Sequence, residues 1–553
     1  MRSSANSRTL TDAETQRLKL RGETFIVAWS ALLVSLFALS FSYSRGIMLL
    51  YGDAVAHLHI ARRIIDSLNP GLTQLGSVWL PLPHLLLVPF VARLEWWQSG
   101  VAGAFPSMGA YVFGAAGIYR LARHWVQPGS ALVAALFFAL NPGLLYMQTT
   151  AMNEPLFLTE MIWAVLLIVE YGRALQTAEL ERAAKLLIAS GIVLVAAVFT
   201  RYDGWIFTFL AWLVVFAKTL RSMRWHTRVG GAFVLFTVML TVAPVIWMAY
   251  CARQFGDPLD FMRGPYSAKA IEQRTATPGA PHYPGWHSMP VAALYFLKAA
   301  EMGSTLLRFA NLLLILSIAG SVGAAARWCA RDGFTPLLLW VPLPFYAYSV
   351  AYGSVPIFIP LWWPHSWYNT RYGMEMLPIF ALSLGFLVAC VSDWMARYRP
   401  TVARWVPAAL ALLIIANNAV LLRAKPLVLD EAIANSRTRI PFEVAYAHAL
   451  QLLPQNATIL AYTSDHIGAF QRAGIALQHT INETDYYQWL PALKYPAKAA
   501  DFVITTDGDA VAKAVAAKPE GLTLINIVCS TGQPCVRIYS SERHSAGGSI
   551  TPK

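Results

Sequence analysis

The chain has 553 residues, of which 56% are hydrophobic and only 13% are charged. Soluble proteins usually carry about 25% charged residues, so this composition excludes a cytosolic enzyme, a disordered scaffold and a fibrous protein. The net charge of +13 does not indicate nucleic-acid binding, because Lys and Arg cluster at the ends of apolar runs, where membrane proteins carry the charges that set their orientation. These features predict a polytopic α-helical membrane protein.

Apolar runs suited to bilayer-crossing helices of about 20 residues recur along the first 424 residues, and charged segments divide them into about eleven predicted spans. The predicted spans are 24–44, 101–119, 130–147, 155–172, 186–200, 204–217, 229–250, 309–326, 334–351, 374–391 and 405–422.

The distribution of positive charge predicts the orientation of these spans. With a cytoplasmic N-terminus, the inner segments hold 19 Lys and Arg in 74 residues, against 11 in 136 for the outer loops 45–100, 251–308 and 352–373. This asymmetry follows the positive-inside rule. We therefore expect a cytoplasmic tail at 1–23, a membrane domain at 24–424 and, because the number of spans is odd, an extracytoplasmic domain at 425–553.

The first outer loop carries two polar residues at helical spacing. Asp53 and His57 are four residues apart, so on a helix they share a face and can hydrogen-bond. An acid beside an imidazole can activate a nucleophile or bind a metal; the alternative is an interfacial helix whose polar side meets water. The later run Val78–Leu94 contains three prolines, and we expect it to lie on or dip into the outer face.

Two further outer turns carry charged side chains. Glu154 stands between the third and fourth spans, where a carboxylate either caps a helix N-terminus or serves a site at the bilayer edge. Arg201 and Asp203 lie in the turn between the fifth and sixth spans. They either bind substrate or pair with each other at the surface, a contact worth about 0–1 kcal/mol.

Aromatic residues and one arginine gather in residues 362–378, ahead of the tenth span. Trp363, His365 and Tyr372 fit an interfacial aromatic belt, but aromatic faces also suit the apolar faces of sugar rings. The guanidinium of Arg371 is planar and suited to a phosphate.

Residues 425–553 have a different pattern. Short β-rich runs at 458–462, 501–505, 522–528 and 535–540 are separated by helical stretches such as Asp509–Ala517. This pattern predicts a small α/β domain. Cys529 and Cys535 bracket a turn between two of the expected strands; in an oxidising outer compartment they can pair, and otherwise they are two free thiols.

In the predicted topology all of these candidate site residues are on the outer side of the membrane. Acids suit the activation of a hydroxyl, an arginine suits a phosphate and aromatic rings suit a sugar. Together they predict glycosyl transfer from a lipid-linked phosphate donor to an acceptor outside the cytoplasm.

Residues 24–422 resemble the GT-C superfamily of integral-membrane glycosyltransferases, which includes protein O-mannosyltransferases, aminoarabinose transferases and oligosaccharyltransferases. Four motifs carry the resemblance: Gly52-Asp53-Ala54 in the first outer loop, Tyr119–Arg123 at the end of a small-residue span, Asn153-Glu154-Pro155 in the second outer loop, and Arg371-Tyr372 ahead of Pro378. The first loop lacks the adjacent second acid of the O-mannosyltransferases, and the outer domain lacks the oligosaccharyltransferase sequon-binding signature. These departures argue against either subfamily.

The resemblance implies roles for the candidate residues. It implies Asp53 as the general base, assisted by His57 or Glu154, in a single displacement that inverts the anomeric carbon. Arg371, with Arg201 second, is expected to hold the donor phosphate. The other expected substrate-binding residues are Asp203, Tyr372, Trp363 and His365.

The resemblance also implies the partners of the protein. The expected donor is a polyprenyl-phosphate sugar, the acceptor is a protein, lipid or glycan, and the expected location is the bacterial inner membrane. No cofactor is expected, and a divalent metal beside His57 is the less favoured option.

Two alternative functions remain: a transporter or flippase for a lipid-linked sugar, and a surface-polysaccharide polymerase or ligase that uses a lipid-diphosphate donor. A transporter usually shows repeated halves, and no repeat is evident here.

Overall fold

The computed structural model describes residues 12–225, 227–276, 278–329, 332, 334–464 and 466–547. Residues 1–11 of the expected cytoplasmic tail lie outside the described residues. The rest of that tail is helical from Asp12 and continues without a break into the first span.

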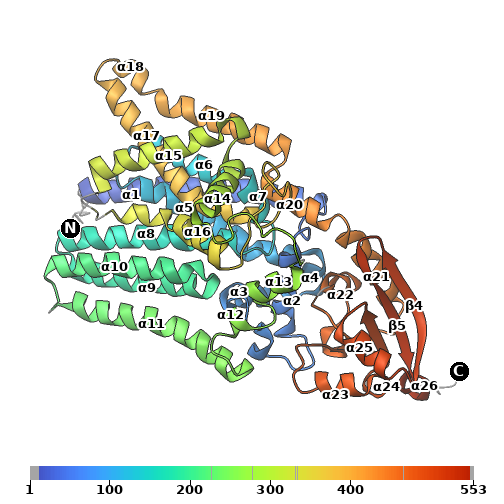
Figure 1. Ribbon diagram of the computed structural model, residues 1–553. Coiled ribbons are helices and arrows are strands. Elements are labelled where there is room, and N and C mark those ends of the chain that lie inside the picture. Colours follow the sequence, from blue (N-terminus) through green and yellow to red (C-terminus); the bar gives the residue numbers. More distant parts are fainter. Residues whose placement is uncertain are drawn as a thin grey trace, which may run out of the picture.

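Nine helical segments of the described chain are long and apolar enough to cross a membrane. In Figure 1 the long helices lie side by side as a bundle, and the C-terminal sheet stands beyond one end of it. The main helices of these segments are α1 (Asp12–Ser44), α5 (Val101–Ala122), α8 (Glu154–Gln176), α9 (Leu180–Thr200), α10 (Asp203–Ser222), α11 (Arg228–Phe255), α15 (Ala310–Ala324, between η2 Leu307–Phe309 and η3 Ala325–Cys329), α17 (Leu377–Ala396, after η5 Thr370–Met376) and α19 (Val406–Ala424, after α18 Pro400–Ala403).

Two of the eleven expected spans are broken helices. The span expected at 130–147 is α6 (Pro128–Ala139) followed by α7 (Pro142–Met147), and the span expected at 334–351 is η4 (Thr335–Trp340) followed by α16 (Pro342–Tyr352). In both, the second helix starts with a proline, which fits the first turn of a helix but not its interior. The side chain of Asn141 caps α7 by accepting a hydrogen bond from the Leu144 amide at 2.9 Å.

Burial divides the bundle into a centre and a periphery. The helix α8 and the segment formed by η5 and α17 are covered by their neighbours, whereas α1 and α19 lie at the edge. The edge helices expose large apolar side chains such as Phe37 and Leu412. Apolar side chains on the outside and helices that satisfy their own backbone groups suit a lipid solvent, so the protein is an integral membrane protein.

Short helices fill the end of the bundle that faces the sheet (Figure 1). The run Val78–Leu94, expected at the membrane face, forms one helix of 11 residues and the start of a second. The short helices at this end are α2 (Gly52–Arg63), η1 (Leu72–Leu75), α3 (Pro81–Val91), α4 (Leu94–Ser99), α12 (Asp260–Arg263), α13 (Ala268–Thr275) and α14 (Met289–Ser304).

The C-terminal segment forms a five-stranded mixed sheet in the order β2-β1-β3-β5-β4, which confirms the expected α/β fold. The strand β1 pairs in parallel with β2 and β3, while β5 pairs antiparallel with β3 and β4. Cys529 and Cys535 form a disulfide across the turn between β4 and β5. The elements of this segment are α20 (Leu427–Ser436), α21 (Arg439–Gln451), β1 (Ile459–Ala461), α22 (Ile467–Ala473), η6 (Leu477–His479), β2 (Thr480–Ile481), α23 (Trp489–Lys494), α24 (Pro496–Ala499), β3 (Phe502–Thr506), α25 (Ala510–Ala517), β4 (Leu522–Ser530), β5 (Gln533–Ser541) and α26 (Glu542–Gly547).

Hydrogen bonds tie this C-terminal segment to the loop that follows α1. Arg439 of α21 donates to the carbonyl oxygens of Leu49 and Leu50 at 3.1 and 2.8 Å. Gln471 of α22 donates to the carbonyl of Trp97 at 2.5 Å. The segment therefore holds the backbone that leads into α2, where Asp53 lies.

The contact between α15 and α17 depends on a glycine. A Cβ atom on Gly320 would lie 2.0 Å from the backbone oxygen of Ser383, whereas one on Gly231 of α11 would meet nothing within 4 Å. We expect Gly320→Ala to destabilise the bundle by about 1–3 kcal/mol through overpacking and Gly231→Ala to leave it unchanged. Thermal unfolding in detergent measures both, and equal melting temperatures for the two variants would contradict this packing.

Candidate active site

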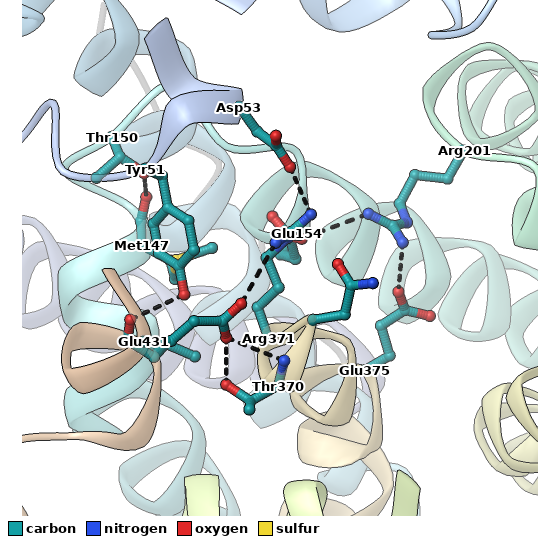
Figure 2. A network of polar contacts seen from close by, with 12 residues as sticks. Tyr51, Asp53, Met147, Thr150, Glu154, Arg201, Thr370, Arg371, Glu375 and Glu431 are labelled. Atoms are coloured by element: carbon teal, nitrogen blue, oxygen red, sulfur yellow. Dashed lines mark hydrogen bonds and ion pairs between the residues drawn. The ribbon is translucent and has the colours of Figure 1, made fainter. Parts of the chain in front are cut away.

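The side chains expected to carry the chemistry come together at the end of the bundle that faces the sheet (Figure 2). Asp53 lies in the first turn of α2, Glu154 begins α8, Arg201 stands between α9 and α10, and Arg371 lies in η5. These residues are far apart in sequence. The close approach of four helix ends therefore builds the site.

Arg371 contacts three carboxylates. Its Nη2 is 2.6 Å from Oδ2 of Asp53, and its Nε is 3.1 Å from Oε1 of Glu154. Its Nη1 is 3.7 Å from Oε1 of Glu431, which comes from α20. The Arg371 side chain is only 10% exposed. Burying its positive charge costs much free energy, and the three carboxylates compensate that charge.

Arg201 forms the second centre of the network. It lies 3.1 Å from Asp203, 3.1 Å from Glu375 and 3.5 Å from Glu154. Pairing with Asp203 was one of the two roles expected for Arg201, and the contact to Glu375 was not expected. Because Glu154 contacts both guanidiniums, the two centres form one network.

The tight turn that presents Arg201 requires a glycine after Asp203. A Cβ atom at Gly204 would lie 2.3 Å from the carbonyl oxygen of Ala197 in the preceding helix. Any larger residue would therefore push α9 and α10 apart at the point where Arg201 and Asp203 enter the network.

Aromatic rings line both arginines. The ring of Tyr372 lies 4.9 Å from the Arg371 guanidinium and 5.2 Å from that of Arg201. Tyr346 stacks on Tyr372 with ring centroids 5.0 Å apart, and its hydroxyl lies within hydrogen-bonding distance of Arg201, Asp203 and Glu375. Cation–π contacts of this kind strengthen when water is excluded, so the rings add to the stabilisation that the acids give the guanidiniums.

Carboxyl groups outnumber guanidiniums in this network. Two arginines face five carboxylates, and the second oxygens of Glu154 and Glu375 are buried without a hydrogen-bond partner among the described atoms. The Asp53 side chain is 39% exposed, whereas that of Glu154 is 1% exposed. Asp53 is therefore the acid of this network that an incoming substrate can reach most easily. The five carboxylates belong to Asp53, Glu154, Asp203, Glu375 and Glu431.

His57 has a different partner from the one expected. Its Nδ1 lies 2.8 Å from Nε2 of His84, and its ring lies 4.4 Å from that of Trp79. The partner of Asp53 in the described network is Arg371. Burial, together with the positive charges of Arg371 and Arg201, lowers the pKa of His57 to about 3, so His57 is neutral at physiological pH.

Trp363 and His365 lie in the loop that precedes η5, and their described hydrogen bonds are with residues outside the charged network. The carbonyl of Trp363 accepts a hydrogen bond from the Tyr295 hydroxyl at 2.7 Å, and Nδ1 of His365 lies 3.2 Å from the carbonyl of Pro360. Trp363 is 48% exposed. The structure thus brings seven of the nine expected residues to the site or its immediate surroundings and leaves these two in the loop.

Sequence reasoning missed three members of the network. Tyr346 lies in a broken span and does not stand out in an apolar run, whereas Glu375 is a charged residue at the start of the predicted span 374–391 and was not selected. Glu431 follows the last span and was assigned to the C-terminal domain. A carboxylate or hydroxyl that becomes buried at a span end is a sign of function, and that sign would have selected Glu375.

No group of three or more His, Cys, Asp or Glu side chains that could hold a metal ion occurs among the described residues. The network itself consists of charge-paired side chains at hydrogen-bonding distances. Such an arrangement can position an acid and hold an anion.

The low pKa of His57 predicts acid sensitivity. Between pH 6.5 and 3 the unfolded chain binds a proton that folded His57 excludes, so stability is lost as the pH falls through this window. Between pH 7.5 and 5.0 we expect the free energy of unfolding of His57→Gln to fall by about 2 kcal/mol less than that of the wild type. Thermal unfolding at the two pH values measures this, with exposed His448→Gln as the control; equal losses in wild type and His57→Gln would contradict the burial argument.

The sequence matches no protein-family model and no curated protein. In structure it is similar to ArnT from Cupriavidus metallidurans bound to undecaprenyl phosphate, with a TM-score of 0.56 and 13% identity over 94% of this chain and 98% of ArnT. The apo form of ArnT gives a TM-score of 0.53 and 15% identity over the same shares. The oligosaccharyltransferase AglB from Archaeoglobus fulgidus, in complex with an inhibitory peptide and a dolichol-phosphate, gives 0.47 and 13% over 87% of this chain and 69% of AglB.

The match to ArnT extends over nearly the whole of both chains and includes the bundle and the C-terminal segment. At this level of identity the likeness is one of fold. The chain therefore has the fold of ArnT, a GT-C glycosyltransferase, as its sequence motifs indicated.

Proposed function

We propose that the protein is a membrane glycosyltransferase that moves a sugar from a polyprenyl-phosphate donor to an acceptor hydroxyl on the extracytoplasmic face. Asp53 acts as the general base, and the displacement inverts the anomeric carbon. The observation that carries the proposal is the pairing of a reachable carboxylate with a buried arginine: Asp53 and Arg371, 2.6 Å apart.

The exposure of Asp53 supports its role as the base. A general base must come within hydrogen-bonding distance of the proton that it removes, and Asp53 is far more exposed than Glu154. The contact with Arg371 orients the Asp53 carboxylate, and Glu154 holds Arg371 from the other side. The acceptor hydroxyl loses its proton to Asp53 and attacks the anomeric carbon, while the bond from that carbon to the phosphate oxygen breaks.

Arg371 is our candidate for holding the donor phosphate. A guanidinium has five N–H donors, and the hydrogen bonds to Asp53 and Glu154 use two of them. Arg201 is the second candidate, because it shares Glu154 with Arg371. Polyprenyl phosphate leaves as an anion, so no strong general acid is needed.

The contacts of His57 argue against a direct catalytic role for this residue. Its Nδ1 lies 2.8 Å from Nε2 of His84, whereas Asp53 pairs with Arg371. We therefore give the assisting role to Glu154 and propose that His57, with His84 and Trp79, supports the face of α2 that carries Asp53.

The charge distribution supports the extracytoplasmic side for the site. Arg120, Arg173 and Arg221 lie near the C-terminal ends of α5, α8 and α10, and the site lies at the opposite end of α8. Positive charge is retained on the cytoplasmic side of membrane proteins. This arrangement also favours an extracytoplasmic C-terminal domain, and we propose the bacterial inner membrane as the location.

The proposal predicts the effect of Asp53→Asn. Removing the base lowers turnover by about 10²–10⁴-fold, while the protein stays folded because Glu154 and Glu431 still compensate the charge of Arg371. The measurement is release of radiolabelled sugar from a panel of polyprenyl-phosphate monosaccharides by the purified protein. Asp66→Asn is the matched control, because Asp66 pairs with Arg62 on the same loop outside the network.

With lipid-diphosphate donors and a vesicle assay added to this experiment, three results would contradict the proposal. Full activity of Asp53→Asn would remove Asp53 from the chemistry. Activity only with a lipid-diphosphate donor would identify a polymerase or ligase. Passage of the intact donor across a vesicle, without release of sugar, would identify a carrier.

A further inference from the structure

Glu431 comes from outside the bundle and contacts the residue that precedes Arg371 as well as Arg371 itself. Its Oε2 accepts a hydrogen bond from the backbone amide of Thr370 at 2.9 Å and another from the Thr370 hydroxyl. Its Oε1 faces Nη1 of Arg371 at 3.7 Å. Glu431 is only 1% exposed, so its carboxylate interacts with these groups and not with water.

Helix α20, which carries Glu431, also contacts the loop segment just before Asp53. The Tyr51 hydroxyl donates to the carbonyl of Val428, one turn before Glu431, at 2.8 Å. The ring of Tyr51 lies 5.5 Å from the Arg371 guanidinium. Figure 2 shows Glu431 and Tyr51 on one side of Arg371, with Asp53 and Glu154 on the other. Helix α20 therefore contacts Arg371 directly and also contacts Tyr51, two residues before Asp53.

Glu431 differs from Asp53 and Glu154 in its position in the network. Asp53 reaches solvent, and Glu154 joins the two arginines. Glu431 adds a negative charge behind Arg371 without contacting Arg201 among the described ion pairs. A buried charge at this distance acts through a lower dielectric constant than water, so it reduces the attraction of Arg371 for any further anion.

Such a reduction matters because the product binds a cation more strongly than the donor does. The donor phosphate is a diester with one negative charge, whereas the released polyprenyl phosphate is a monoester with about 1.5–2 negative charges at pH 7. A fully available arginine would hold the product more tightly than the donor. Turnover requires that the product leave.

We infer that Glu431 is a positioning residue that weakens the hold of Arg371 on the phosphate of the lipid carrier, so that polyprenyl phosphate is released after transfer. This inference rests on the proposed function. Glu431 does not touch the reacting atoms; it acts through the charge and orientation of Arg371.

The test is the affinity of the purified full chain for undecaprenyl phosphate, measured by native mass spectrometry. Glu431→Gln keeps acceptors for Thr370 and removes the charge, and we expect it to bind undecaprenyl phosphate about tenfold more tightly than the wild type. Glu431→Ala removes the same charge and must also bind more tightly. Glu431→Asp restores the charge and should return the affinity to the wild-type value.

Two controls separate the charge of Glu431 from its structural role. Thr370→Val removes one hydrogen bond to Glu431 and no charge, so we expect no tighter binding. Glu170→Gln removes a buried carboxylate that pairs with Arg120 at 2.7 Å at the other end of the bundle, and it should also leave the affinity unchanged. In turnover assays, Glu431→Gln should lower kcat and increase inhibition by added undecaprenyl phosphate.

A merely structural role for Glu431 would give the opposite result. If the wild type binds undecaprenyl phosphate and both Glu431→Gln and Glu431→Ala bind it equally or more weakly, the inference is wrong while the proposed function stands. If the wild type does not bind undecaprenyl phosphate at all, the proposed function fails, and the inference fails with it.

Discussion

The ion pairs of Arg371 are the constraint on which the arrangement of this site depends. A guanidinium that is 10% exposed at the end of a membrane bundle needs compensating charge. The compensation comes from α2, α8 and α20 together, through Asp53, Glu154 and Glu431. These helices can satisfy Arg371 only if the loop after the first span and the segment after the last span fold against the same bundle end.

This constraint joins the C-terminal segment to the chemistry. Its helices hold the backbone of Leu49 and Leu50 just before α2, and α20 places Glu431 behind Arg371. The sheet itself lies farther out along the chain and in space (Figure 1). The C-terminal segment is thus both a separate sheet and, through α20, a wall of the candidate active site.

The apolar spans and the strands were predictable because burial leaves a pattern in local sequence. Long apolar runs predicted the helical bundle, and four of the five strands coincide with β-rich runs, whereas the two-residue β2 has no such run. The breaks at Pro142 and Pro342 show where hydropathy alone misses a helix boundary. Asp53, Glu154, Arg201 and Arg371 were identifiable as polar residues at span ends, although the partner of each was not.

Sequence alone determined that this is a helical membrane protein with a C-terminal α/β segment, because hydropathy, charge and residue alternation act over a few neighbouring positions. Only the tertiary structure decided which charges meet. Asp53 and His57 are spaced so that they could hydrogen-bond on a helix. Instead, Asp53 pairs with Arg371, 318 residues away, and His57 contacts His84. Glu431 belongs to the network for the same reason. The packing of the helices in three dimensions determines which groups contact a buried charge, and sequence spacing does not predict these contacts.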